Sequence, residues 1–350
     1  MMFWRKYIHS FMVNDEVFQL SKANTINIDS LPPWLKDHYL FIREWINDKD
    51  YIKVKTSGST GNPKTIKIHK NAFVFSALNT GKYLKLNPKD KALLCLPGSY
   101  IAGKMMIVRT FVLGLNLFWQ RPSSTPELNR KIDFAAMTPM QLQGILTTNK
   151  STINNIDKLI IGGAPVNSYI LDNISILKTK IYETYGMTET VSHIAIKSIN
   201  GNKKSEYFSV LPDIKIGIDK RKCLTITSDK LHVNKLASND LVEIISNNKF
   251  KWLGRFDNVI NSGGIKLVPE QIEAKLKKSI KNDFYIFGIQ DPLLTNVPAL
   301  VIEGKPEKFN LDFTKVLDKF EIPKKIYFLK KFIRTDSGKI KRKETLKFIT

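Results

Sequence analysis

The chain has 350 residues, of which 43% are hydrophobic and 25% are charged, and this composition excludes an intrinsically disordered or fibrous protein. Its formal net charge of +23 is compatible with a nucleic acid, an anionic membrane surface or polyanionic small molecules as partner. Because the lysines are scattered along the chain and only the stretch 330–343 is dense in them, charge alone does not choose among the three.

The cysteines and the apolar stretches indicate in which cellular compartment the protein is expected. Cys95 and Cys223 lie far apart in apolar surroundings, which excludes a disulfide framework and a cysteine metal cage and is typical of a reducing cytoplasm. The N-terminus lacks the apolar core and cleavage site of a signal peptide. The longest apolar stretch, 105–119, is broken by Arg109 and Asn116 and falls short of the roughly 18 residues of a membrane span. We therefore expect a cytoplasmic protein without integral membrane association.

Short β-branched runs alternate with amphipathic stretches from residue 51 to about 183, and this alternation predicts βα units around a sheet. Helices are expected over 71–85 and 140–148, the second with Pro139 near its first turn. The expected strands are 51–55, 65–69, 92–97, 133–138, 158–163 and 180–186.

The pattern of predicted secondary structure changes after about residue 205. Short strands follow one another there, with Asn247-Asn248 as a hairpin turn, and predict a β-rich subdomain. From Phe256 onward come a helix opened by Pro269, a strand pair across 291–298 and a last helix. We therefore expect an α/β fold with a large N-terminal domain over 1–255, its β-rich subdomain at about 205–255, and a small mobile α+β C-terminal domain over 256–350.

The stretch TSGSTGNPK, residues 56–64, frees backbone N–H groups and hydroxyls in the manner of a polyphosphate loop, with Lys64 as a point charge. Pro63 stands where the Walker loop needs glycine, and the period-two run TIKIH follows where that loop opens a helix. A P-loop NTPase is therefore not expected. Taken alone, the stretch would be an ordinary Gly/Ser hairpin turn.

Three later stretches complete a pattern. YETYGMTET at 182–190 offers a stacking surface, a hydroxyl and a carboxylate suited to Mg²⁺, although alone it also fits the first turn of a helix. GRFDNVINSGGIKLVPEQIE at 254–273 follows Asp240, whose carboxylate suits the two hydroxyls of a ribose. TDSGKIKRK at 335–343 carries Lys339 on a glycine-containing loop, which alone would be a solvated lysine.

In this order, the four stretches resemble the signatures of the adenylate-forming superfamily, which includes acyl- and aryl-CoA ligases. The resemblance implies that Tyr185 stacks on adenine, Thr188 contacts the α-phosphate and Glu189 holds Mg²⁺. It implies that Asp240 and Arg255 bind ribose, although the usual TGD is SND here, and that Lys339 contacts the acid and phosphate. Further nucleotide-binding positions implied by it are Thr56, Ser57, Gly58, Ser59, Thr60, Gly61, Lys64, Gly163, Ala164, Gly186, Gly263 and Gly264.

The same resemblance implies a two-step reaction. ATP first adenylates a carboxylic acid with release of pyrophosphate, and a thiol then attacks the acyl-adenylate. No carrier domain follows in this chain, so coenzyme A is the expected acceptor. Asp257 matches the hinge about which the small domain turns between the two steps. A homo-oligomer is left open.

Within the superfamily, stretches 96–114 and 185–197 resemble the o-succinylbenzoate–CoA ligases of menaquinone biosynthesis. Arg109 matches an arginine that pairs with the second carboxylate of that substrate, and a buried arginine needs an anion. A structural salt bridge is the alternative for Arg109, and Lys104 is a second candidate. Ser192 and His193 are expected to line the acyl pocket, with a surface histidine as the alternative. Another aryl or fatty acid remains open as substrate.

Two further classes of protein fit the sequence less well. A nucleic-acid-binding protein would interleave aromatic residues with arginine on one face, whereas this chain shows dispersed lysine, so no nucleic acid is expected. A non-catalytic adenylate binder would be expected to lose part of the chemical set. That set is complete here: Lys64, Glu189, Asp240, Arg255 and Lys339.

Overall fold

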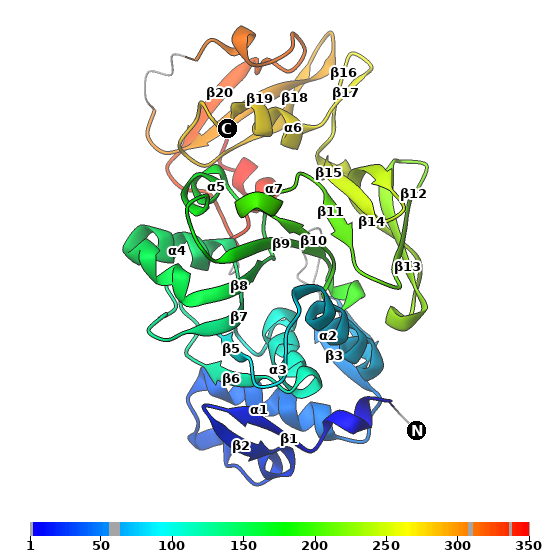
Figure 1. The fold of residues 1–350 in the computed structure, drawn as a ribbon. Coiled ribbons are helices and arrows are strands. Elements are labelled where there is room, and N and C mark those ends of the chain that lie inside the picture. The colour runs from blue at the N-terminus through cyan, green and yellow to red at the C-terminus, as the bar shows by residue number, and fades with distance from the viewer. Residues whose placement is uncertain (1–2, 56–63, 307–310, 336–337, 350) are drawn as a thin grey trace. The chain divides into compact units, whose positions relative to one another are not determined.

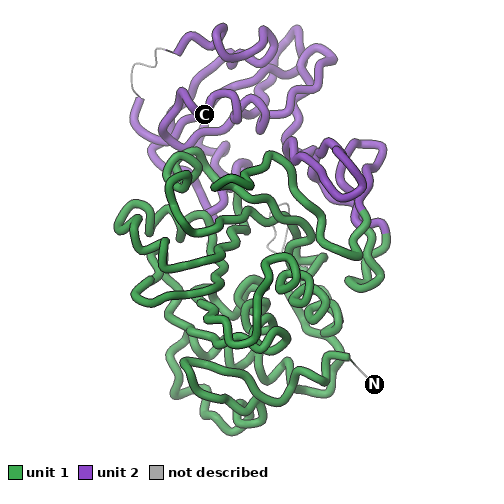
Figure 2. The backbone as a smooth tube through the Cα atoms, viewed as in Figure 1, with its two compact units in different colours: residues 1–215, 227–234 green, residues 216–226, 235–350 purple. Residues whose placement is uncertain are grey.

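The computed structural model describes residues 3–55, 64–306, 311–335 and 338–349. These residues form two compact units, one of residues 1–215 and 227–234 and the other of residues 216–226 and 235–350 (Figure 2). The described part of the first loop begins at Lys64, so the predicted phosphate-loop residues lie outside the described residues: Thr56, Ser57, Gly58, Ser59, Thr60 and Gly61.

The first unit is built on a mixed sheet in the strand order β11-β10-β9-β8-β7-β5-β6-β1-β2 (Figure 1). The strands from β9 to β1 are parallel to one another, while β2, β10 and β11 are antiparallel to their neighbours. The strands of this sheet are β1 (Ser10–Val13), β2 (Glu16–Gln19), β5 (Lys91–Leu94), β6 (Asn116–Trp119), β7 (Ile132–Met137), β8 (Ile156–Ile161), β9 (Lys180–Gly186), β10 (His193–Ser198) and β11 (Phe208–Val210).

Helices cover both faces of this sheet. Ala135 of β7 belongs to a buried apolar cluster with side chains of α4 and α5, whereas its neighbour Phe134 points to the other face and lies beneath Arg109 of α3. Since successive strand residues face opposite sides, the two observations place helices on each face. The helices of the unit are α1 (Pro33–Ile46), α2 (Lys70–Leu84), α3 (Ile101–Leu113), α4 (Pro139–Asn149) and α5 (Ser168–Ile174).

Local sequence accounts for several of these elements. α4 begins at Pro139 after a reciprocal cap between Thr138 and Gln141, which satisfies backbone N–H groups at the helix start. α3 ends at Gly114, whose φ of +66° is the left-handed conformation that glycine adopts most readily. The predicted α/β fold is confirmed. The strands expected at 51–55 and 65–69 are also formed, as β3 (Tyr51–Lys55) and β4 (Thr65–His69), but they pair with each other in a separate hairpin outside the main sheet.

The second unit contains a run of four neighbouring strands and a separate sheet. The four strands are β12 (Lys215–Ile218), β13 (Cys223–Ser228), β14 (Val233–Ser246) and β15 (Lys249–Arg255), in this order, and β14 pairs antiparallel with β15. The other sheet is formed by β16 (Ile260–Ser262), β17 (Ile265–Leu267), β18 (Phe284–Asp291), β19 (Thr295–Glu303) and β20 (Lys325–Leu329). α6 (Pro269–Leu276) packs on this second sheet through Ile272 and Leu276, and α7 (Arg342–Leu346) ends the unit.

The β-rich segment 235–255 thus groups with the C-terminal residues in this structure. The domain boundary at 255/256 and the hinge at Asp257 remain predictions. Both cysteines are buried and free. Among the residues that the structure describes, none of the helices has the length and apolar character that crossing a membrane would require.

Candidate functional site

Four predicted residues, Tyr185, Gly186, Thr188 and Glu189, lie where β9 ends, at the carboxyl edge of the parallel strands. β9 leads into a single turn, η5 (Thr188–Thr190), which is closed because the Met187 N–H donates to the Thr190 hydroxyl at 3.1 Å. Thr188 is half-buried in this turn and Glu189 is exposed. A hydroxyl and a carboxylate therefore stand together at the edge where open α/β sheets bind their ligands.

Gly186 is the residue that lets this turn approach β10. A Cβ atom at this position would lie 2.2 Å from the Ser192 carbonyl oxygen and 2.5 Å from the His193 Cα atom. Because both neighbours are backbone, no larger residue fits without moving the strand. Tyr185, the preceding residue, is half-buried with its ring centroid 5.8 Å from that of Phe208, so it offers an aromatic surface beside the turn.

Gly163 and Ala164 follow the neighbouring parallel strand, β8. Gly163 is exposed, adopts a φ of +88°, and a Cβ atom there would meet nothing within 4 Å. Its glycine is therefore explained by backbone conformation, not by close packing. Lys64 is exposed at the start of β4, at the end of the undescribed loop.

Arg109 lies in the middle of α3 and is only 2% exposed. Its Nη2 atom donates to Ser192 Oγ at 3.0 Å, its Nη1 atom lies 3.6 Å from the Met106 sulfur, and its Nε atom is buried without a hydrogen-bond partner. No carboxylate of the described chain lies within ion-pair distance of it. Burial lowers the pKa of Arg109 to about 9, which still leaves the guanidinium charged at neutral pH. The structure thus brings Arg109 and Ser192 together.

His193 is 7% exposed, so the alternative of a surface histidine is wrong. Its Nε2 atom lies 3.1 Å from the Thr80 hydroxyl and its Nδ1 atom 3.3 Å from Ser192 Oγ. Burial, and secondly the charge of Arg109, hold the pKa of His193 well below its usual value. His193 is therefore neutral at pH 7, which keeps a second positive charge away from Arg109.

Lys104 has different partners from Arg109. Its ammonium lies 3.7 Å from the Glu44 carboxylate and 5.3 Å from the centre of the Phe41 ring. It is thus paired with a side chain of α1, and the geometry favours Arg109 over Lys104 as the cation available to an anionic ligand.

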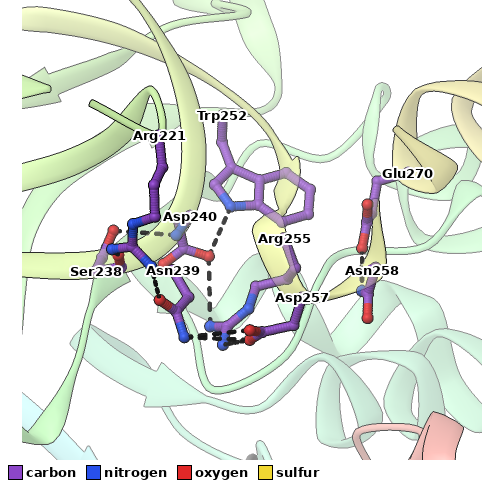
Figure 3. Close-up of polar contacts among 9 residues, drawn as sticks. All are labelled: Arg221, Ser238, Asn239, Asp240, Trp252, Arg255, Asp257, Asn258 and Glu270. Carbon is purple, nitrogen blue, oxygen red and sulfur yellow. Dashed lines mark hydrogen bonds and ion pairs between the residues drawn. The ribbon is translucent and has the colours of Figure 1, made fainter. Parts of the chain in front are cut away.

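In the second unit, the pairing of β14 with β15 places Asp240 opposite Arg255. Asp240 is 8% exposed, accepts a hydrogen bond from Trp252 Nε1 at 3.1 Å, and lies 3.5 Å from Arg255 Nη1 (Figure 3). Arg255 also reaches Asp257, with 3.1 Å between Nη2 and Oδ2. Asp240 is therefore a buried carboxylate in a fixed orientation. Such an orientation is needed for a carboxylate that accepts hydrogen bonds from two vicinal hydroxyls.

Lys339 belongs to a tight loop in the same unit. Its backbone N–H donates to the Thr335 hydroxyl at 3.1 Å, and Gly338 before it has a φ of +85°. Burial lowers the pKa of Lys339, the charge of Arg255 lowers it further, and Asp240 acts in the opposite direction. The ammonium of Lys339 thus feels the charges of the predicted ribose-binding pair.

Gly263 and Gly264 form the two-residue turn between β16 and β17. Their φ angles are +57° and +87°, the combination that a type I′ hairpin turn requires. The Gly263 N–H donates to the Leu294 carbonyl at 2.8 Å, which joins this turn to the loop between β18 and β19. The two glycines are therefore explained by turn geometry, and their role toward an acyl group remains a prediction.

The donor set fits the nucleotide and metal that the resemblance implies. Within the described residues there is no group of three His, Cys, Asp or Glu side chains that would hold a metal ion by itself. Mg²⁺ in phosphate-transferring enzymes is commonly held by one or two carboxylates together with substrate phosphates, so the single exposed Glu189 is adequate. Asp240 is a buried carboxylate acceptor, and its role toward ribose remains a prediction.

Two participants in these contacts were not predicted from the sequence: Thr80 and Trp252. The approach of Trp252 to Asp240 depends on two register shifts in the pairing of β14 with β15, and the Asn247-Asn248 turn does not indicate them. Thr80 lies on α2, 113 residues from His193, and no local pattern indicates that contact.

Comparisons with known proteins agree with this geometry. The profile described as AMP-binding enzyme matches residues 54–218. A crystal structure of an AMP-forming acyl-CoA synthetase/AMP-acid ligase II-like protein from Dyadobacter fermentans is 37% identical, with 94% of this chain and 98% of that chain covered and a TM-score of 0.63. A 2-succinylbenzoate–CoA ligase of Listeria innocua is 25% identical over 86% of this chain and 70% of its own length.

A solved o-succinylbenzoate coenzyme A synthetase from Bacillus subtilis, in complex with ATP and magnesium, shares the fold. Its TM-score is 0.72 at 21% identity, with 84% of this chain and 69% of that chain covered. The fold and these comparisons define a nucleotide-binding α/β enzyme. The chain belongs to the AMP-binding enzymes, the adenylate-forming family of AMP-forming acyl-CoA synthetases.

Proposed function

We propose that this protein is an ATP-dependent acid–CoA ligase whose acid is o-succinylbenzoate. The observation that carries the choice of acid is Arg109, a buried guanidinium that touches Ser192 and has no carboxylate partner among the described residues. A buried cation without an anion is costly unless a ligand supplies one. The distal carboxylate of an aromatic dicarboxylic acid would do so, and curated relatives named 2-succinylbenzoate–CoA ligase support the same acid.

In the first step, the carboxylate of the acid attacks the α-phosphorus of ATP and pyrophosphate leaves. Asp240 would hold the ribose, Tyr185 would stack on the adenine and Thr188 would donate to the α-phosphate. Lys339 would offset the charge that develops on the acid and the phosphate. When bound, Mg²⁺ supplies charge neutralisation to the phosphates, with Glu189 as its protein ligand.

In the second step, the thiol of coenzyme A attacks the carbonyl carbon of the acyl-adenylate and AMP leaves. A turn about Asp257 would withdraw Lys339 and bring Gly263 and Gly264 to the acyl group.

A pyrophosphate-release assay of the purified protein tests this proposal. The panel contains o-succinylbenzoate, benzoate, a medium-chain fatty acid and a dicarboxylic aliphatic acid, each with ATP, Mg²⁺ and with or without coenzyme A. We expect o-succinylbenzoate to exceed benzoate by about 10⁴-fold in kcat/KM, the discrimination typical of a site that hydrogen-bonds a polar group of its substrate. Equal rates on benzoate or the fatty acid would assign a different acid.

A further inference from the structure

Asn239 bridges two charged side chains in the second unit. Its Oδ1 atom accepts a hydrogen bond from Arg221 Nη1 at 2.8 Å, and its Nδ2 atom lies 3.2 Å from Asp257 Oδ2, as Figure 3 shows. Asn239 is the middle residue of Ser238-Asn239-Asp240, where the motif of the adenylate-forming family has glycine. The bridge is thus a contact that the usual motif has no side chain to make.

The bridge acts on the segment predicted to be the hinge, η8 (Phe256–Asn258). The Arg221 guanidinium lies over the Phe256 ring, 5.2 Å from its centre, and Asn258 Nδ2 donates to Glu270 Oε1 at 2.5 Å. Asp257 itself is held from two sides, by Asn239 and by Arg255. Each residue of the segment therefore has a side-chain contact to a neighbouring element of the same unit.

Arg221 is well placed to anchor the bridge. Its Nη2 atom donates to the Ser238 carbonyl at 3.0 Å and lies 2.7 Å from Asp219 Oδ2, so the guanidinium is fixed to the turn between β12 and β13. Through Asn239 this fixed group reaches Asp257, and through Asp257 it orients Arg255 beside Asp240. A single side chain thus joins the β12–β13 turn to the predicted ribose-binding pair.

We propose that Asn239 is a positioning residue that latches the hinge in the conformer seen here. In this conformer Asp240, Arg255 and Lys339 belong to one compact unit, and the proposed adenylation needs Asp240 at the ribose and Lys339 at the phosphate of the same ATP. Turning about Asp257 would break its hydrogen bond to Asn239, so the latch slows or disfavours the change to the thioester-forming conformer. This inference rests on the proposed two-step function.

The strength of the latch follows from its surroundings. A hydrogen bond to a carboxylate is among the stronger ones, but this carboxylate is partly exposed and solvent competes for it. We expect its removal to change the balance between the two conformers by about two- to fivefold.

The experiment compares Asn239→Ala and Asn239→Asp with the wild-type full-length chain. Asn248→Ala is the control, since Asn248 lies at the far end of the same hairpin, where its Oδ1 atom accepts a hydrogen bond from the Ser246 hydroxyl at 2.9 Å. Pyrophosphate release reports adenylation, and thioester formation from presynthesised acyl-adenylate reports the second step. Hydrogen exchange of the ligand-free protein reports opening of amides 255–260.

For Asn239→Ala we expect adenylation to fall relative to thioester formation by about two- to fivefold, with faster exchange at 255–260. Asn239→Asp keeps an acceptor for Arg221 but places a second carboxylate beside Asp257, so its effect should be larger. If Asn239 had only a structural role, Asn239→Ala would lower both steps equally. If Asn239 did not act on Asp257, Asn239→Asp would behave like the wild type. Either result overturns the latch.

The hydrogen-exchange readout separates this inference from the proposed function. It needs neither acid nor coenzyme A, so faster exchange in Asn239→Ala but not in Asn248→Ala supports the latch even if no acid in the panel is adenylated. Unchanged exchange at 255–260 in both Asn239 variants overturns it even in a fully active ligase.

Discussion

Arg109 and Ser192 are joined by a hydrogen bond of 3.0 Å although 83 residues separate them in the sequence. The bond connects the middle of α3 to the segment between η5 and β10, two places that carry no common sequence pattern. In this bond, one of the five N–H donors of the guanidinium donates to a neutral hydroxyl. The Nε donor is buried without a hydrogen-bond partner. A charged group so incompletely satisfied is ready for an anionic ligand.

Replacing Arg109 by alanine should therefore impair the acid more than the nucleotide. We expect kcat/KM for o-succinylbenzoate to fall about 30- to 100-fold, the cost of losing a charge-assisted contact in a buried site, while the KM for ATP changes less than twofold. Steady-state kinetics with each substrate varied in turn measures the split. Lys104→Ala, which removes a cation already paired with Glu44, is the matched control and should leave the acid KM nearly unchanged.

Lys339→Ala should separate the two chemical steps. Loss of the ammonium removes the cation expected at the developing phosphate charge, so adenylation should fall about 100-fold or more. Thioester formation from presynthesised acyl-adenylate should stay within about threefold of the wild type. Lys341→Ala is the control, because Lys341 is exposed to solvent and pairs with Glu344. A parallel loss of both steps in Lys339→Ala would show that the residue serves folding and not adenylation.

Much of the architecture was accessible from local pattern. The run TIKIH alternates with period two and forms β4, and Pro139 marks the start of α4, because each signal acts within a few residues. The separation of β3 and β4 from the main sheet was not accessible, since alternation indicates a strand but not its neighbours. Motif order likewise indicated the residues at the end of β9. The burial of His193 is a tertiary property, set by α2 and α3, and the sequence left it open.

His193 should make stability depend on pH. Burial, with the charge of Arg109, lowers the pKa of His193 in the folded state. Below pH ~6.5 the imidazole is therefore protonated in the unfolded chain while it stays neutral in the folded chain. Stability contributed by the neutral imidazole is therefore complete above about pH 6.5 and is lost as pH falls, by up to about 1.4 kcal/mol per pH unit.

Urea unfolding at intervals between pH 5 and 8 measures this effect. His193→Gln should flatten the acid limb of the curve relative to the wild type. Part of the slope should persist, since burial also lowers the pKa of His38. His9→Gln, at an exposed position, is the control. An acid limb identical in the wild type and His193→Gln would mean that His193 is protonated in the folded protein without cost.

Gly186→Ala should damage the nucleotide site through packing alone. The new methyl group would meet the Ser192 carbonyl oxygen and the His193 Cα atom at separations that real contacts do not reach, so β10 or the turn after β9 must shift. Because the turn carries Thr188 and Glu189, we expect the KM for ATP to rise at least about tenfold, with a loss of about 2 kcal/mol in the free energy of unfolding. Gly288→Ala, whose methyl group would lie at an ordinary 3.4 Å from Ile260, controls for the substitution itself. Normal ATP kinetics in Gly186→Ala would show that the turn after β9 does not bind the nucleotide.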